Sequence, residues 1–148
     1  MIEALRLENQ LCFALYAASR AVIQAYRPLL APLGITYPQY LVLLVLWEGN
    51  APLVGELGDR LDLDSATLTP MLKRMEAQKL LLRDRQAADQ RQVRIHLTPE
   101  GNALRAKAAE IPPALACRYG VDSVEPLIVL RETLKALREK VRGEAPEL

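Results

Sequence analysis

Residues 61–75 read LDLDSATLTPMLKRM, and three apolar side chains in this run recur at helical spacing. They are Leu68, Leu72 and Met75. This spacing predicts the buried side of a helix that ends near Lys79. Asp64 is a good N-cap for the helix but puts Pro70 six residues inside it, whereas a start at Thr67 tolerates the proline better. We therefore expect an irregular first turn.

A shorter helix is expected just before this one, over residues 54–61, and a four-residue turn separates the two. Two short helices joined in this way are typical of a helix-turn-helix, whose second helix enters the major groove of DNA. The outward side of the second helix carries hydroxyl and basic side chains, namely Ser65, Thr67, Thr69, Lys73 and Arg74. Hydroxyl groups can bond to base edges, and cations can contact phosphates. Because many helix pairs share this pattern, a solvated helix surface stays open as an alternative at this point.

Two strands follow, over residues 80–85 and 92–97, with a polar loop between them. In the second strand apolar residues alternate with polar ones, which is typical of a half-buried strand. Residues 73–94 hold seven basic and three acidic side chains, a local net charge of +4, while the whole chain carries only +1. Basic charge confined to one segment fits a module that binds in a groove of nucleic acid, and it argues against a protein that coats nucleic acid.

Further helices are expected on both sides of this core, over residues 5–33, 38–48, 99–112 and 123–142. Pro28 and Pro32 are expected to kink or end the first, which Gly34 closes. Thr98 caps the third of these helices, with Pro99 at its first position. The first and last helices have more apolar surface than one small core covers. A twofold dimer explains that surplus more readily than a monomer does.

The expected fold class is mainly α, with a small β-hairpin. A single domain spans residues 1–148, and its winged helix-turn-helix core covers residues 38–98. Segments 5–33 and 99–142 form the dimerisation region. A hydrophobic fraction of 51% and a charged fraction of 25% are near the average for folded soluble proteins and exclude a disordered chain.

The composition also bears on compartment, membranes and metals. Residues 28–47 carry no charge, but proline, glycine and glutamine interrupt them, so they predict a buried helix and not a membrane span. The N-terminus lacks the pattern of a signal peptide, and we expect a cytoplasmic protein whose two cysteines are thiols. His96 is the single histidine. With two distant cysteines it predicts no metal site, and no cofactor is expected.

Residues 89–101 read DQRQVRIHLTPEG, which resembles the wing signature of the MarR family of regulators. The resemblance extends over about residues 5–142. It implies that Arg91 at the wing tip enters the minor groove of DNA and that Asp89 orients it. Arg85 lies in the same basic hairpin. Because a basic hairpin directly follows the second helix, the helix-turn-helix interpretation is preferred over a solvated helix surface.

Three further stretches resemble the organic-hydroperoxide-sensing repressors within that family: LENQLCFALY at 7–16, TYPQY at 36–40 and LDSATLTPMLKR at 63–74. By this resemblance Cys12 is the peroxide-reactive cysteine, and Tyr26 and Tyr37 hydrogen-bond its thiolate. Cys117, expected between the last two helices, resembles the resolving cysteine of the two-cysteine subgroup. The resemblance further implies a disulfide between subunits and a reduced homodimer that binds operator DNA until organic hydroperoxide oxidises it.

The distance along the first helix agrees with a site shared by two subunits. Tyr26 lies fourteen residues after Cys12, about 21 Å along a continuous helix, so it cannot reach Cys12 of its own chain. A phenolic hydroxyl that donates to a thiolate stabilises it relative to the thiol. On the residues alone, however, Cys12 fits a small buried hydrophobe, Cys117 an incidental thiol, and the two tyrosines ordinary core aromatics.

Two other functions fit parts of the sequence. A thiol peroxidase also uses a reactive and a resolving cysteine, but the chain shows neither alternating strands and helices nor a Cys-x-x-Cys motif, so we expect no enzyme. A MarR-type regulator that binds a phenolic compound, with incidental cysteines, is the other alternative.

Overall fold

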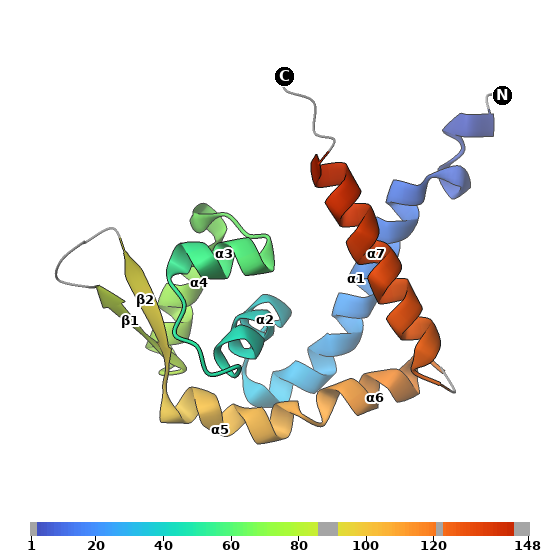
Figure 1. Cartoon of the computed structure of the whole chain (residues 1–148). Helices are drawn as coiled ribbons and strands as arrows, with labels where there is room; N and C mark the ends of the chain where they lie inside the picture. Colours follow the sequence, from blue (N-terminus) through green and yellow to red (C-terminus); the bar gives the residue numbers. More distant parts are fainter. Residues whose placement is uncertain (1–2, 86–91, 121–122, 144–148) are drawn as a thin grey trace. The chain divides into compact units, whose positions relative to one another are not determined.

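The computed structural model describes residues 3–85, 92–120 and 123–143. The chain forms two compact units, Met1–Ile111 and Pro112–Leu148. The helices are α1 Leu11–Leu30, α2 Tyr37–Leu46, α3 Val54–Leu61, α4 Ser65–Ala77, α5 Pro99–Ala108, α6 Ile111–Arg118 and α7 Glu125–Gly143. Strands β1 Leu81–Arg85 and β2 Val93–Leu97 form one antiparallel sheet (Figure 1). The mainly α winged helix-turn-helix that the sequence predicts is confirmed.

The first helix is shorter than predicted. Short 3-10 turns occupy Glu3–Leu5 and Leu7–Asn9, and α1 begins only at Leu11. The Gln10 side chain donates to the carbonyls of Ala4 at 2.6 Å and Arg6 at 3.2 Å, which stabilises these turns in place of a longer helix. At the other end, α1 stops at Leu30, a 3-10 turn follows, and Gly34 closes it in the left-handed conformation at φ +67°.

The helix-turn-helix is built on α3 and α4. The Leu63 amide donates to the Gly58 carbonyl at 3.0 Å, and a Cβ atom at Gly58 would lie 2.7 Å from the Leu63 oxygen. Asp64 accepts a hydrogen bond from the Thr67 amide at 2.7 Å, and α4 is regular from Ser65 onward. The predicted irregular first turn is therefore wrong. Asp64 caps the helix well, and Pro70 removes only one hydrogen bond from its interior.

The hairpin pairs Leu81 with Leu97 and Arg85 with Val93, so both strands lie within one residue of their predicted limits. The segment just before α3 adds to its outer edge, because the Ile95 amide donates to the Pro52 carbonyl at 2.9 Å. The predicted wing tip, with Asp89 and Arg91, lies outside the described residues.

The core of the first unit is formed by α2, α3, α4 and the hairpin. Fully buried side chains come from each of them: Leu43, Leu46, Leu57, Leu72 and Ile95. Thr98 caps α5 by accepting from the Gly101 amide at 3.0 Å, as predicted. Gly101 packs so closely that a Cβ atom there would lie 2.1 Å from the Leu80 oxygen. This contact fixes the beginning of α5 against the hairpin.

The helices after the hairpin differ from the prediction. The helix that begins at Pro99 ends at Ala108, and a separate helix, α6, covers Ile111–Arg118. Pro112 and Pro113 suggest an end to helical structure, but they occupy the first turn of α6, where a missing amide hydrogen costs no intrahelical bond. Cys117 therefore lies on a helix and not in a connection.

No single helix in the described ranges is both long and apolar enough to cross a bilayer. Leu11–Leu33 together with Tyr37–Leu46 has the required length and composition, but this pair is bent by 70°.

Candidate nucleic-acid interface and redox site

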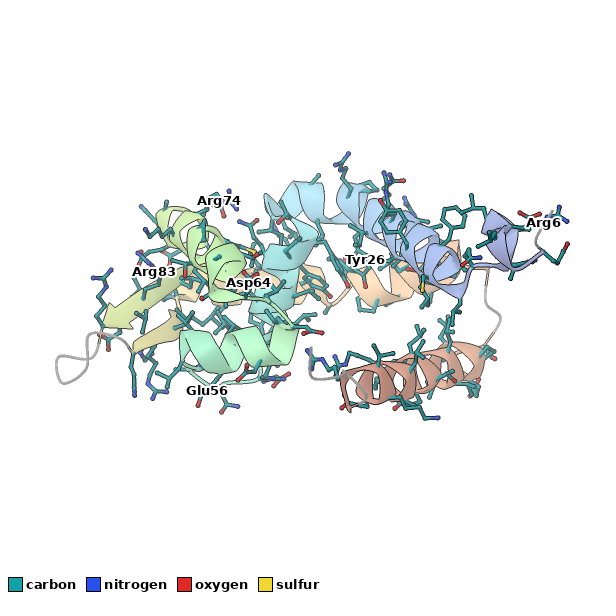
Figure 2. The ribbon with its side chains drawn as sticks, turned by 90° about the horizontal axis from the view of Figure 1, so that it is seen from above. Arg6, Tyr26, Glu56, Asp64, Arg74 and Arg83 are labelled. Atoms are coloured by element: carbon teal, nitrogen blue, oxygen red, sulfur yellow. The ribbon has the colours of Figure 1, made fainter. Side chains whose placement is uncertain are left out.

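Helix α4 has the two sides that the sequence predicts. Leu68, Leu72 and Met75 are buried. Of the candidate DNA-contacting residues on α4, Ser65, Thr67, Lys73 and Arg74 are exposed, and Thr69 is half-buried. Figure 2 shows Arg74 at the outer side of α4. The helix thus presents hydroxyl and basic groups to solvent.

An ion pair between Glu76 and Arg83, called the fork below, links α4 to the hairpin. Glu76, in the last turn of α4, accepts from the Arg83 amide at 2.9 Å, from its Nε at 2.8 Å and from its Nη2 at 2.7 Å. These bonds, the one from the Arg83 amide first, hold the pKa of Glu76 below its ordinary value. Arg83 therefore belongs to the internal structure, whereas Arg85, at the end of β1, is exposed. Sequence reasoning missed this pair, which only the turn from helix to strand brings together.

A second ion pair fixes α3 on the end of α2. Arg60 donates from Nη1 to Glu48 Oε2 at 2.7 Å and from Nη2 to Oε1 at 2.9 Å. This bidentate contact lowers the pKa of Glu48 and holds the first helix of the helix-turn-helix against the core. No local sequence pattern predicts this pair, because twelve positions separate the partners.

The predicted thiolate-binding tyrosines lie together. The rings of Tyr26 and Tyr37 are 4.6 Å apart, and the Tyr40 ring is 5.8 Å from that of Tyr26. Figure 2 shows where Tyr26 sits on α1. Burial raises the pKa of Tyr40 above its usual value, the neighbouring Tyr37 adding to the effect. A hollow of about 330 Å³ beside Tyr37 is lined mainly by apolar groups, including Ile23 and Leu30.

Cys12 lies at the other end of the same helix. It is an exposed thiol in the first turn of α1, and α1 runs without a break from Leu11 to Leu30. Fourteen helical residues span about 21 Å, so the chain keeps Cys12 away from its own Tyr26. Cys117 is a second exposed thiol, on α6 in the second unit. Within the described ranges, no cluster of three or more potential metal ligands occurs.

Known proteins resemble this chain in both sequence and fold. A family model described as the transcriptional regulator SarA/Rot matches residues 24–108. The organic hydroperoxide resistance transcriptional regulator of Bacillus subtilis is 49% identical over 139 residues, covering 92% of this chain and 95% of that protein.

Two solved structures of AbfR from Staphylococcus epidermidis are also similar. Reduced AbfR bound to DNA has a TM-score of 0.76 and 41% identity, over 94% of this chain and 97% of that one. Disulfide-formed AbfR has a TM-score of 0.65 and 43% identity, over 91% and 94%. This chain therefore belongs to the MarR-type winged helix-turn-helix transcriptional regulators, in the group of the organic hydroperoxide resistance regulators.

Proposed function

We propose that this chain works as a homodimer that binds operator DNA when Cys12 is a thiol and releases it after an organic hydroperoxide oxidises Cys12. The observation that carries this proposal is the position of Cys12, one helix length from the tyrosine pair of its own chain. If tyrosines of a second copy complete the site around Cys12, the arrangement of the two DNA-binding units in the dimer depends on whether the Cys12 sulfur is oxidised. The relatives named for hydroperoxide resistance and for a DNA-bound reduced form support it.

The dimer is proposed from apolar surface that the chain leaves open. On α1, Leu11 is 61% and Phe13 43% exposed. On α7, Leu130 is 54% and Leu134 39% exposed. Two antiparallel copies of α1 would place Cys12 of each chain near Tyr26 of the other. Each chain would act as one domain, and its segments 5–33 and 99–142 would form the dimer interface.

DNA binding is assigned to α4 and the hairpin. Ser65, Thr67 and Thr69 would contact base edges, and Lys73 and Arg74 phosphates. In the wing, Arg91 would enter the minor groove, with Asp89 orienting it and Arg85 beside it. Replacing Arg91 with alanine should weaken operator binding by about 1 to 3 kcal/mol, with a shallower salt dependence if a phosphate contact is lost.

The proposed chemistry has two balanced steps. The Cys12 thiolate attacks the terminal oxygen of the hydroperoxide, the O–O bond breaks, and the alkoxide leaves as an alcohol after taking a proton; sulfur is oxidised to the sulfenic acid. The Cys117 thiolate then attacks the Cys12 Sγ, a disulfide forms, and the hydroxyl leaves as water with one added proton. We assign this disulfide to the dimer interface.

A gel mobility-shift assay tests the whole function. The DNA flanking the gene of this chain is the probe, with and without one equivalent of cumene hydroperoxide. We expect a retarded band that peroxide abolishes, that survives peroxide in Cys12→Ser, and that a thiol restores. Response to peroxide in Cys12→Ser would contradict the sensor and favour a ligand-responsive regulator, while catalytic consumption of peroxide would favour a thiol peroxidase.

Non-reducing electrophoresis tests the disulfide separately. Oxidised parent protein should run as a covalent dimer that is absent in both Cys12→Ser and Cys117→Ser. A linked species of monomer size would place the bond within one chain.

The tyrosines are tested by Tyr26→Phe and Tyr37→Phe. Loss of either hydroxyl should slow alkylation of Cys12 near neutral pH while leaving DNA binding of the reduced protein intact. Alkylation rates equal to those of the parent at every pH would remove the tyrosines from the mechanism.

A further inference from the structure

Both buried polar side chains in the described part of the chain converge on the two residues that follow α4. These side chains are Gln39, 6% exposed, and Thr98, 7% exposed. Gln39 Nε2 donates to Gln78 Oε1 at 3.2 Å, and Thr98 Oγ1 donates to the Lys79 carbonyl at 2.6 Å. The end of the helix proposed to contact DNA is therefore held by directional bonds from two different segments.

The first of these segments carries Tyr37. Gln39 lies two residues beyond Tyr37 in the first turn of α2, and its Oε1 accepts from the Thr36 amide at 2.9 Å. Gln78 Nε2 in turn donates to the Gly34 carbonyl at 3.3 Å. The two glutamine side chains thus connect both ends of the Gly34–Thr36 connection to the end of α4.

These hydrogen bonds cross an open groove. A groove of about 680 Å³ opens between the beginning of α2 and α4, lined by Thr36, Gln39, Met71 and Gln78 among others. Apolar packing across an open groove is sparse and tolerates sliding, whereas the Gln39 to Gln78 bond is directional. Gln39 is buried and Gln78 is exposed, so breaking this bond would leave the buried Gln39 amide without its partner.

The second segment is the beginning of α5. Thr98 accepts from the Gly101 amide while it donates to Lys79, and its own amide donates to the Leu80 carbonyl at 3.3 Å. Lys79 adopts a left-handed backbone with φ +60°, so the chain leaves α4 in a defined direction between these two ties.

We propose that Gln39 and Gln78 are positioning residues of the redox switch, which carry a displacement of the Tyr37 end of α2 to the DNA-binding helix α4. This inference rests on the proposed function, because it needs a redox event that moves α2. Oxidation that displaces Tyr37 shifts the first turn of α2, and the Gln39 to Gln78 bond pulls the end of α4 with it. Thr98 supplies the fixed point on the α5 side, about which α4 turns.

The test compares Gln78→Met, which keeps the length of the side chain but removes both bonds, with Gln78→Glu. In Gln78→Glu the carboxylate still accepts the hydrogen bond from Gln39 Nε2, and only the hydrogen bond donated to the Gly34 carbonyl is lost. The quantity measured is the switching ratio, the operator Kd after one equivalent of cumene hydroperoxide divided by the Kd of the reduced protein. Asn102→Leu, at an exposed position of α5, is the control for losing an amide.

We expect Gln78→Met to lower the switching ratio about tenfold, with the reduced Kd within threefold of the parent and an unchanged rate of Cys12 oxidation. Gln78→Glu should keep most of the ratio, and Asn102→Leu all of it. An unchanged ratio in Gln78→Met would overturn the inference, and so would equal losses in Gln78→Met and Gln78→Glu. If Gln78→Met lowers the Tm and the reduced affinity together, the role is structural and the inference also fails. A parent protein that keeps its DNA after peroxide would instead contradict the proposed function.

Discussion

Leucines in α2 and α3 and leucines in α7 follow the same helical spacing but meet different surroundings. Leu43 and Leu57 are fully buried against their own chain, whereas Leu130 and Leu134 of α7 are 54% and 39% exposed. The first unit closes its core with its own helices and hairpin, and α7 contributes no buried side chain. Helical spacing therefore shows that a helix has an apolar side, while only the neighbours decide whether the same chain or a second copy covers it.

The largest effects are expected when one leucine of each region is replaced with alanine. Leu57→Ala should lower the free energy of unfolding by about 2 to 5 kcal/mol, because it leaves a cavity in a closed core. Leu134→Ala should instead weaken the dimer, so its effect grows as the protein is diluted. Urea unfolding and sedimentation at two concentrations, one a hundredfold higher, measure both. An unchanged dimer fraction in Leu134→Ala would refute our account of α7.

Two glycines of the first unit, one closely packed and one exposed, sharpen the comparison. Gly101→Ala would place a Cβ atom 2.1 Å from the Leu80 oxygen, so we expect a loss of about 1 to 3 kcal/mol or more. Gly55→Ala meets nothing within 4 Å and should stabilise α3 by about 0.5 to 1 kcal/mol. Thermal unfolding of both variants checks the opposite signs. Equal effects would mean that the packing at the beginning of α5 is looser than the structure shows.

At the surface of the core, the fork between Glu76 and Arg83 should show a dependence on pH. The folded protein lowers the pKa of Glu76, so its stabilisation is present above the unfolded value of about 4.3 and is lost as the pH falls through the folded value. Glu76→Gln should therefore cost about 1 kcal/mol at pH 7, and the difference should shrink in acid below about pH 4. Urea unfolding of parent and variant across this range measures it. If the free energies of unfolding of parent and variant differ by the same amount at pH 3 and pH 7, the charge of Glu76 is excluded as the cause of that difference.

The smallest effect is expected at Lys79, whose φ of +60° is strained for a residue with a side chain. Lys79→Gly should stabilise the first unit by about 0.5 to 1 kcal/mol, because glycine adopts this conformation without a steric penalty. The bond from Thr98 goes to the Lys79 carbonyl and survives the change. Chemical unfolding measures the change. A loss of stability would show that the Lys79 side chain stabilises the folded protein by more than its left-handed backbone conformation destabilises it.

Local patterns gave most of the elements. The strands were predicted within one residue because period-two alternation is itself the signal. The caps at Asp64 and Thr98 were also found, since a capping side chain bonds to residues three positions away. Helix α6 was missed because Pro112 and Pro113 suggest an end to a helix as well as a beginning.

The candidate site was predictable to a different degree. The outward residues of α4 follow from periodicity, and Cys12 with its tyrosines from resemblance alone. The bonds between Glu76 and Arg83 and between Gln39 and Gln78 left no signal in the sequence. Neither pair belongs to one helix at a spacing of three or four, and each forms only because two elements pack side by side.

By itself the sequence determined the order of helices and strands, the inward and outward sides of α4, and the separation of Cys12 from Tyr26 along one helix, because all of these depend on spacing within a single element. The tertiary structure alone decided which polar groups meet, from the fork at Glu76 to the bonds that hold Gln78 and Lys79 at the end of α4. Such contacts join residues up to 44 positions apart, and no local pattern encodes that separation. Their formation requires the packed core that brings α2, α4 and α5 together.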